Sequence, residues 1–278
     1  MRLGDRLLDL TQPQVMAIVN ITPDSFYSGA RTMDDEAIAT RVRQVVDEGA
    51  SIIDIGGYSS RPGAEDVSVE QEWERVSRAL AVVQDVAKDV VVSVDTFRAE
   101  VARLSIEQAG AIIINDISAG EADAAMVEVV AHYGVPYVAM HMRGTPQTMQ
   151  QQTTYERGVV AEVSSYFDSK LEWLEKRGVK DIILDPGFGF AKSVEQNYEL
   201  LAGLHLLRDK GYPLLVGVSR KSMIYKVLNT SPQEALNGTS ALHWEALQQG
   251  ATILRVHDVR EACEVVKLWQ NYKKWQSI

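Results

Sequence analysis

The sequence predicts a closed (β/α)8 barrel, the TIM-barrel architecture, formed as a single domain by residues 1–278. Eight short apolar runs alternate along the chain with longer amphipathic segments. Several of these segments end in glycine, which is typical of the C-terminus of a helix. No linker, low-complexity tract or block of like charge marks a domain boundary.

The apolar runs have the composition of strands that are buried on both faces. β-Branched residues dominate them, as expected for a parallel sheet that helices cover. The predicted strands are "VMAIVN" (15–20), "SIIDIG" (51–56), "VVVSVD" (90–95), "AIIIND" (111–116), "VPYVAMH" (135–141), "DIILDP" (181–186), "PLLVGVS" (213–219) and "ATILRVH" (251–257).

The segments between the strands have apolar residues three and four positions apart, which predicts amphipathic helices. Helices are predicted over 34–49, 97–110 and 164–178, each ending in a glycine. Another is predicted over 231–250, where Ser231 can cap the helix and Pro232 suits its first turn. The last helix is predicted at about 259–275.

A doubly wound open sheet is the structural alternative. Its dinucleotide-binding form carries a Gly-x-Gly-x-x-Gly turn after the first strand, and this sequence lacks one there. The paired glycines of "DPGFGF" follow the sixth predicted strand and do not complete that pattern. The barrel is therefore favoured.

Composition and charge exclude several classes of partner. The formal net charge of −10 argues against binding to nucleic acid or to a membrane through a basic surface. No apolar run approaches the roughly 20 residues that span a bilayer. The single cysteine, Cys263, cannot form an internal disulfide, which fits a reducing compartment. A cytoplasmic protein is expected.

Polar side chains gather at the C-terminal ends of the predicted strands. In a barrel these ends form one rim, where active sites lie. Any one of them could be a helix cap or turn former, but their recurrence at every strand indicates a site. They are Asn20, Asp54, Asp95, Asn115 with Asp116, His141, Asp185, Ser219 with Arg220 and Lys221, and Arg255 with His257.

Two charge groups suggest the kind of ligand. Asp95, Asn115 and Asp185 could form an acid/base pair, accept hydrogen bonds from a flat guanidine-like ring edge, or hold a metal. Tight metal binding ranks low because no histidine is among the three. The cations Arg220, Lys221, Arg255 and His257, with Asn20, indicate an anion site that suits phosphate.

Eight motifs resemble those of the dihydropteroate synthase family, in that family's order and over residues 16 to 259. They are "NITPDSF", "DIGGYSSRPGA", "VSVDT", "IINDISAG", "MHMRGTPQTMQ", "DPGFGF", "GVSRKS" and "LRVHDV". The resemblance implies a TIM barrel that joins 6-hydroxymethyl-7,8-dihydropterin diphosphate to p-aminobenzoate, giving 7,8-dihydropteroate and pyrophosphate in folate biosynthesis. It also implies Mg2+, a homodimer and a target for sulfonamides.

The resemblance assigns roles to individual residues of this sequence. Asp95, Asn115, Asp185 and Lys221 would bind the pterin, with Met140 and Gly217 beside it. Asn20, Arg255 and His257 would hold the diphosphate, and Asn20 also the Mg2+. Phe26, Ser60, Pro62, Phe190, Lys221 and Ser222 would bind p-aminobenzoate. Arg61 would help to assemble the closed site, so that Lys221, Asp95, Asp185 and Arg61 are the implied catalytic residues.

Mobile loops at about 21–33 and 57–68 would close over the rim, with Phe26 and Pro62 on either side of the p-aminobenzoate ring. The resemblance implies a dissociative mechanism in which pyrophosphate leaves before the arylamine attacks. Three positions depart from the usual loop pattern: Ser28 replaces an acid, Tyr58 a glutamate and Ser60 a threonine. The Ser28 change puts in doubt any role for a loop carboxylate beside Arg61.

Two other functions compete with this one. Corrinoid-linked methyltetrahydrofolate methyltransferases share a pterin-binding barrel but need no diphosphate pocket, and the "SRKS" and "SSRPGA" motifs argue against them. A non-catalytic pterin-binding module would have lost anion-site residues, whereas Asn20 and Lys221 are both present.

Overall fold

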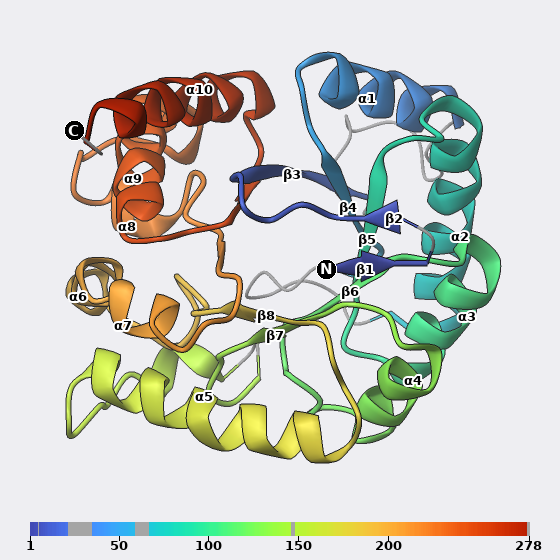
Figure 1. Cartoon of the computed structure of the whole chain (residues 1–278), viewed down its shortest axis with the longest axis horizontal. Helices are drawn as coiled ribbons and strands as arrows, with labels where there is room; N and C mark the ends of the chain where they lie inside the picture. The colour runs from blue at the N-terminus through green and yellow to red at the C-terminus, as the bar shows by residue number, and fades with distance from the viewer. Residues whose placement is uncertain (5, 22–34, 59–66, 146–147, 277–278) are drawn as a thin grey trace.

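Within the residues that the computed structural model describes (1–4, 6–21, 35–58, 67–145 and 148–276), eight parallel strands form a central ring with helices around it (Figure 1). Each strand lies within the run predicted for it or within one residue of it. The strands are β3 (Gln14–Asn20), β4 (Ile52–Gly56), β5 (Val91–Asp95), β6 (Ile113–Asp116), β7 (Tyr137–Met140), β8 (Ile182–Asp185), β9 (Leu215–Val216) and β10 (Ile253–Val256).

The strand order is β8-β7-β6-β5-β4-β3-β10-β9, and a seam between β8 and β9 closes the ring. The seam is narrow. Leu184 and Leu214 form a parallel bridge there, and the Leu184 N–H donates to the Pro213 carbonyl at 2.9 Å. Pro213 has no N–H to return a bond, and β9 is shorter than the predicted run 213–219. The barrel predicted from the sequence is confirmed.

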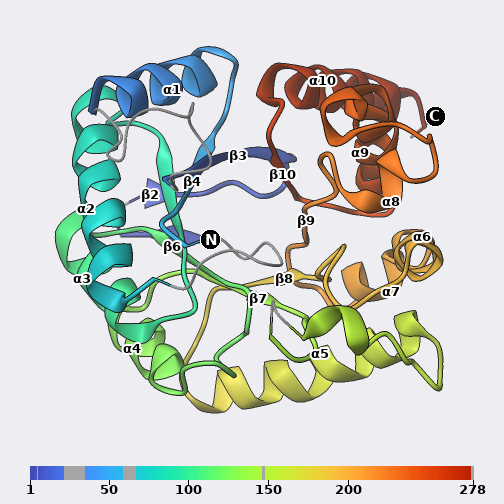
Figure 2. The same ribbon diagram turned by 180° about the vertical axis from the view of Figure 1, so that it is seen from behind.

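The helices pack on the outside of this ring, as the views from front and back show (Figures 1 and 2). They are α1 (Asp35–Asp47), α2 (Val69–Val86), α3 (Ala99–Ala109), α4 (Ala125–Tyr133), α5 (Val159–Lys176), α6 (Val194–Ala202), α7 (His205–Arg208), α8 (Ser222–Tyr225), α9 (Leu236–Gln248) and α10 (Val259–Gln276), with 3-10 turns η2 (Met149–Gln151) and η3 (Pro232–Glu234).

The predicted helix 231–250 is divided in two. Ser231 and Glu234 form a capping box that closes the single turn η3, and α9 starts only after Ala235. The predicted helix 164–178 is longer than expected, because α5 begins at Val159, directly after Gly158 with its φ of 85°.

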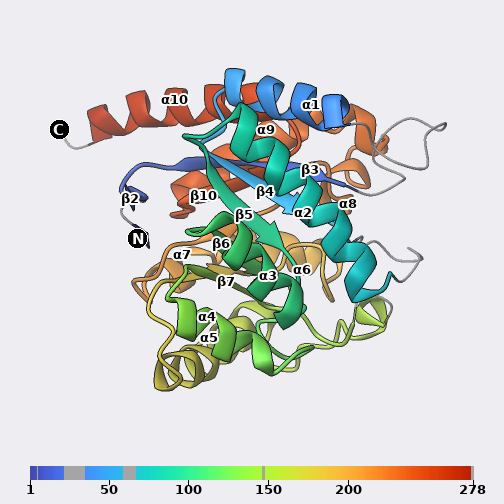
Figure 3. The same ribbon diagram turned by 90° about the vertical axis from the view of Figure 1, so that its right-hand side faces the viewer.

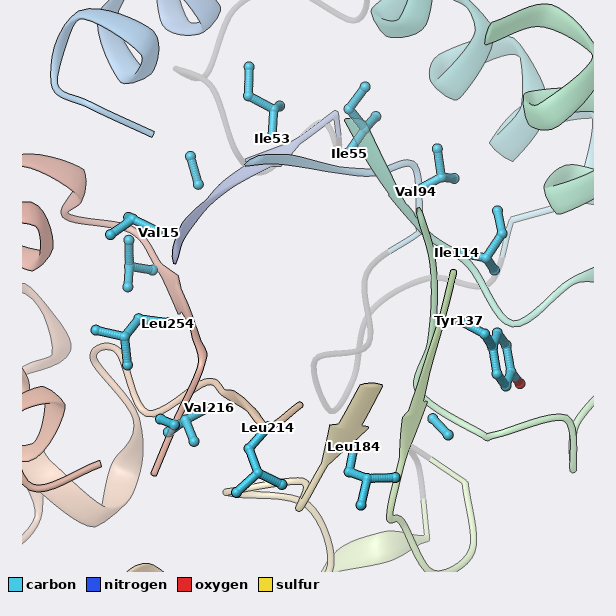
Figure 4. Close-up of a cluster of buried hydrophobic side chains, with 14 of the residues drawn as sticks. Val15, Ile53, Ile55, Val94, Ile114, Tyr137, Leu184, Leu214, Val216 and Leu254 are labelled. Atoms are coloured by element: carbon cyan, nitrogen blue, oxygen red, sulfur yellow. The ribbon is translucent and has the colours of Figure 1, made fainter. Parts of the chain in front are cut away.

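Alternate residues of the strands face the helices and form the main core. Because strand side chains alternate between faces, every second residue points out of the ring. Figure 4 shows these side chains directed outward: Val15, Ile53, Ile55, Val94, Ile114, Tyr137, Leu184, Leu214, Val216 and Leu254. All except Val15 are almost fully buried, and Val15 is 4% exposed.

The inward residues at the start of the strands form a separate apolar floor inside the barrel. Met16, Ile52, Ile113, Val138, Ile183, Leu215 and Ile253 make up this layer. A hairpin that the sequence analysis did not predict, β1 (Arg2–Leu3) with β2 (Arg6–Leu7), covers it from below through Leu3 and the following Leu8. In Figure 3 this hairpin lies at the far side of the barrel from α8.

Several of the inward positions one step further along the strands are polar. Asp54 follows Ile52 by two residues, Asn115 follows Ile113, Asp185 follows Ile183 and Arg255 follows Ile253. A residue two positions along a strand lies on the same face, so these side chains lie above the floor inside the ring. The barrel is thus closed and apolar at its N-terminal end and polar at its C-terminal end, toward which Figure 2 looks.

Candidate active site

Arg255 is the centre of an ion-pair network inside the barrel. Its Nε donates to Asp54 Oδ2 and its Nη2 to Asp95 Oδ2, both at 2.6 Å. Asp54 Oδ2 also accepts from Asn115 Nδ2 at 3.1 Å. β10 is next to neither β4, β5 nor β6, so these bonds cross the barrel interior. Asp95 and Asn115 are direct partners on neighbouring strands.

Burial and the Arg255 guanidinium shift the pKa of Asp95 in opposite directions. Burial raises the pKa of Asp95 to about 7, although Arg255 favours its charged form. The pKa of Arg255 is raised despite burial, because the charges of Asp54 and Asp95 outweigh its desolvation. Arg255 therefore remains a cation, and Asp95 is the acid that titrates near neutral pH.

Asp185 and Lys221 complete the network on the seam side. Asp185 is 7% exposed and its Oδ1 accepts from the Gly187 N–H at 2.8 Å. Burial raises its pKa, and the Lys221 ammonium opposes that rise. Burial lowers the pKa of Lys221 to about 8, which the Asp185 charge counteracts. Lys221 also interacts electrostatically with Asp95 and Arg255, so the acids gather around one interior space.

Gly189 gives the Lys221 side chain room, and Gly217 lies in ordinary contact with its ammonium. A Cβ on Gly217 would lie 3.7 Å from Lys221 Nζ, and one on Gly189 would lie 3.2 Å from its Cδ. The ammonium donates to the Phe188 carbonyl at 2.5 Å and lies 4.9 Å from the centre of the Phe190 ring. Met140, the strand partner of Asp185, is buried beside this group. The predicted residues Met140, Phe190 and Gly217 therefore lie together near Lys221 and Asp185.

Asn20 lies at the end of β3, above Gly56. A Cβ on Gly56 would be 3.0 Å from Asn20 Oδ1 and 3.9 Å from Asp95 Oδ2. The amide oxygen thus approaches the carboxylate across a residue without a side chain. Hard oxygen donors of this kind suit Mg2+. Among the described residues no group of three or more His, Cys, Asp or Glu could hold a metal.

His257 is oriented by Ser219. The Ser219 hydroxyl oxygen accepts from the His257 backbone N–H at 3.2 Å and lies 3.0 Å from its Nδ1. Both contacts are satisfied when the hydroxyl donates to Nδ1, a tautomer assigned from the hydrogen bonds, and this leaves the proton on Nε2. His257 can then donate from Nε2 to an anion.

Three residues expected at the rim face elsewhere. His141 directly follows Met140 and packs edge-to-face on Tyr166 of α5, with ring centroids 4.8 Å apart. Asp116 points out of the barrel, where it accepts hydrogen bonds from the Tyr137 hydroxyl and the Ser118 and Gly120 backbone N–H groups. It follows Asn115 directly, so it lies on the opposite face of β6. Arg220 has φ 55° and forms a two-pronged ion pair with Asp258, so it is not one of the cations that could bind an anion in the site.

Ser222 begins α8, and this helix has only four residues. A macrodipole contribution to anion binding is correspondingly small, because few peptide dipoles are aligned. Phe26, Ser28, Ser60, Arg61 and Pro62, and most of the loops predicted at about 21–33 and 57–68, lie outside the described residues.

The described ends of the second loop are tied to α2 and to the residues after β5. Gly57 accepts from Arg75 at 3.0 Å, and Val67 accepts from Arg98 at 2.6 Å. Tyr58, which replaces the usual glutamate, packs edge-to-face on Phe97 at 5.0 Å and against the Arg98 guanidinium at 5.4 Å.

Two functional candidates were missed by the sequence reasoning. Asp54 was recognised as a strand end but given no role, although it joins Arg255 to Asn115 and is fully buried. Period-two alternation from the apolar Ile52 would have placed it inside the barrel. Lys192 was not considered; it is 5% exposed and pairs with His141 behind the site. A single lysine after "DPGFGF" carries no signal of burial.

Comparison with known proteins shows which family the chain belongs to. The family described as pterin binding enzyme matches residues 16–257. The chain is 44% identical to the dihydropteroate synthase of Escherichia coli (strain K12) over 265 residues, covering 94% of this chain and 92% of that protein.

Solved structures are also similar. Yersinia pestis dihydropteroate synthase in a sulfonamide drug complex has a TM-score of 0.91, with 38% identity over 99% of this chain and 98% of that one. The Xanthomonas albilineans enzyme with 7,8-dihydropteroate has a TM-score of 0.86 at 36% identity, over 98% and 97% of the chains. The chain therefore belongs to the pterin-binding enzyme family, and within it to the dihydropteroate synthases.

Proposed function

We propose that the protein joins 6-hydroxymethyl-7,8-dihydropterin diphosphate to p-aminobenzoate by a dissociative substitution within the polar end of the barrel. The observation that carries this proposal is the network of Asp54, Asp95, Asn115, Asp185, Lys221 and Arg255, in which fixed acceptors and cations surround one interior space. The related X. albilineans structures with 4-aminobenzoic acid and with 7,8-dihydropteroate support the same pair of substrates.

The pterin edge would face Asp95, Asn115 and Asp185. An aminopyrimidinone ring offers N–H donors and a carbonyl in one plane, which two carboxylates and an amide complement. Lys221 would donate to a ring acceptor, exchanging the Phe188 carbonyl for the pterin. Met140 would pack on the ring face, and Gly217 leaves room for that contact.

The diphosphate would lie toward Asn20, Arg255 and His257. Arg255 is held in place by Asp54 and Asp95, and His257 by Ser219, so both donors are oriented before the anion arrives. Mg2+ would be held by Asn20 together with diphosphate oxygens, and would supply positive charge to the leaving pyrophosphate. The oxygen donor of Asn20 beside Asp95 fits this ion.

The chemical step needs no nucleophilic side chain. The bond between the exocyclic methylene carbon and the diphosphate oxygen breaks, and its electron pair leaves with pyrophosphate. The carbon cation is delocalised into the pterin ring, and the acids around Asp95 stabilise it. The neutral amine of p-aminobenzoate then attacks, forms the C–N bond and loses a proton.

The p-aminobenzoate would lie beside Phe190 and Lys221, with its carboxylate toward Ser222. Phe26, Ser60, Arg61 and Pro62 would complete this half from the two loops. Because the Y. pestis relative was solved in a sulfonamide drug complex, we also propose that sulfonamides compete with p-aminobenzoate here.

We further propose a cytoplasmic homodimer. Leu268, Tyr272 and Trp275 lie three and four positions apart on α10 and are 66%, 45% and 71% exposed, an apolar stripe that a second copy would cover. Sedimentation should give a dimer for the native chain and a monomer for Leu268→Glu; an unchanged dimer in the variant would exclude this surface. The single cysteine supports a reducing location. Among the described helices, none is long and apolar enough to cross a membrane.

The test of the function is pyrophosphate release when both substrates and Mg2+ are mixed with the protein. Release that requires p-aminobenzoate supports the proposal. Lys221→Ala and Asp185→Asn should each lose most of it, and normal turnover in both variants would overturn the site assignment. Methyl transfer to a cobalamin protein without pyrophosphate release would instead support the methyltransferase alternative.

A further inference from the structure

The turn between β8 and α6, residues 187–192, has one backbone hydrogen bond of its own, from the Phe190 N–H to the Gly187 carbonyl at 3.1 Å, and side chains supply its other contacts, among them Asn197 Oδ1, which accepts from the Gly189 N–H at 2.7 Å. Its carbonyls accept from Lys192 Nζ at Gly187 (2.9 Å) and Phe190 (3.0 Å), and from the Tyr155 hydroxyl at Ala191 (3.1 Å). The Phe188 carbonyl accepts from Lys221, as described above. A turn without ladder partners depends on such bonds for its shape.

Lys192 is a buried lysine with three acceptors. Besides the two carbonyls, its Nζ lies 3.1 Å from His141 Nδ1. Burial lowers the pKa of Lys192 to about 7, and in its charged form the ammonium group has three N–H donors that these three acceptors satisfy. Burial lowers the pKa of His141 to about 2, which keeps the ring neutral and lets Nδ1 accept. Buried charges are tolerated when all their hydrogen bonds are made.

Two lysines donate hydrogen bonds to carbonyl groups of this turn. Lys192 contacts it from behind, and Lys221 contacts it from the side that faces the site. Gly187 has no room for a side chain, since a Cβ would lie 2.0 Å from the His141 carbonyl oxygen. The turn therefore cannot settle further toward β7, and its position fixes the Phe190 ring next to Lys221.

We propose that Lys192, oriented by His141, is a positioning residue for p-aminobenzoate: it holds the 187–192 turn so that the Phe190 ring and the Lys221 ammonium keep the places that the arylamine requires. The inference rests on the proposed function and deepens it. Lys192 lies behind the turn and acts through it, so it is not a catalytic residue.

The effect should fall on p-aminobenzoate more than on the pterin. Asp95 and Asn115 belong to the other side of the barrel and bond to Arg255 and Asp54, with no contact to the turn. The turn contacts the pterin residues at two points: the Gly187 N–H donates to Asp185, and the Phe188 carbonyl accepts from Lys221. Loosening the turn would move Phe190 and release Lys221, while the Asp54–Arg255 network stays in place.

The test compares Lys192→Met with Lys180→Met, which changes an exposed lysine just before β8. Methionine keeps most of the volume of lysine and removes its donors. We expect Lys192→Met to raise the KM for p-aminobenzoate about tenfold or more, because displaced binding groups lose orientation. The KM for the pterin diphosphate should rise by a clearly smaller factor, because Lys221 and Asp185 are loosened while the bonds of Asp95 and Asn115 to Arg255 and Asp54 stay in place. Lys180→Met should match the native protein in both constants.

A stability measurement and a second variant separate positioning from folding. The melting temperature and the calorimetric affinity for the pterin diphosphate identify folded Lys192→Met protein. Tyr155→Phe removes only the hydroxyl that bonds to Ala191, and should raise the KM for p-aminobenzoate in the same direction by about two- to fivefold.

Three outcomes would overturn the inference: unchanged KM values in folded Lys192→Met, equal rises for both substrates, or a lower melting temperature with Tyr155→Phe kinetically silent. If the native protein releases no pyrophosphate, the proposed function fails instead, and the two failures are thereby distinguished.

Discussion

Asp54→Asn tests whether charge inside the barrel organises the site. Asparagine has the shape of aspartate and keeps an oxygen that can accept from Arg255 and Asn115. Its new amide would take the place of Asp54 Oδ1, which has no partner among the described residues. Ser93 is the strand partner of Asp54, and its buried hydroxyl likewise has no hydrogen-bond partner among the residues that the structure describes. The amide can therefore be accommodated beside it, and the fold should survive.

The expected loss follows from the two bonds that Asp54 accepts. At about 4 Å between charge centres and an effective dielectric constant of about 20, the Arg255 attraction has an upper limit of about 4 kcal/mol. Removing the charge also removes the desolvation penalty of a fully buried carboxylate, which offsets part of this. Hydrogen bonds to charged groups exceed neutral ones by about 1 kcal/mol each, so the net loss should be about 2–3 kcal/mol. That corresponds to a decrease of about 30- to 160-fold in kcat/KM.

The assay is steady-state pyrophosphate release with the pterin diphosphate varied at saturating p-aminobenzoate. Asp89→Asn is the matched control, because it makes the same change at a fully exposed acid whose partner Arg6 is 3.8 Å away. Folding is checked by urea denaturation of both variants. If folded Asp54→Asn protein had kcat/KM within about threefold of the control, charge on Asp54 would not hold Arg255 for the reaction.

The remaining predictions concern pH, the site residues and the metal. Asp95 must be charged to accept from the pterin, and its pKa is about 7, so kcat/KM should rise with pH up to about 7. Lys221 must be charged to donate, and its pKa is about 8, so kcat/KM should fall above about pH 8. A flat profile between about pH 5 and 10 would refute both roles. Lys221→Arg should remove the alkaline fall, since arginine stays charged. Asp185→Asn should lower kcat/KM about 10- to 100-fold by initial rates, because a charged acceptor is lost. Removing Mg2+ with a chelator should stop pyrophosphate release, and Asn20→Ala should raise the Mg2+ concentration for half-maximal rate about tenfold or more; equal metal dependence in the variant would exclude Asn20 as a ligand.

The barrel and most of its site could be predicted from sequence, since both depend on patterns along the chain. Eight apolar runs set the strands, and polar residues at their ends marked the rim. The errors arise where one residue decides the direction of a side chain. Asp116 and Asn115 are adjacent, and only the parity set by Ile113 sends one inward and the other outward. Arg220 turns away because its backbone has a positive φ, which sequence patterns do not reveal for a non-glycine residue.

Three-dimensional neighbours account for what the sequence could not supply. Lys192 and His141 are 51 positions apart, and nothing local in either segment indicates a buried pair. The N-terminal hairpin could not be predicted for the same reason. Leu3 and Leu8 are buried only because they pack on the floor residues that seven strands contribute. Burial of this kind depends on the whole topology.

The narrow seam between β8 and β9 is a place where the barrel can open locally. Asp54, Asp95 and Asn115, on β4, β5 and β6, belong to a continuous hydrogen-bonded ladder. The Phe190 turn and Lys221 instead follow the two strands that meet at the bridge of Leu184 and Leu214. Small separations at that join would change the spacing between the turn and Lys221 without breaking any ladder bond among β3 to β6. Backbone amides at the join should accordingly exchange with deuterium sooner than those of β5, and substrate occupancy should slow the first set more than the second.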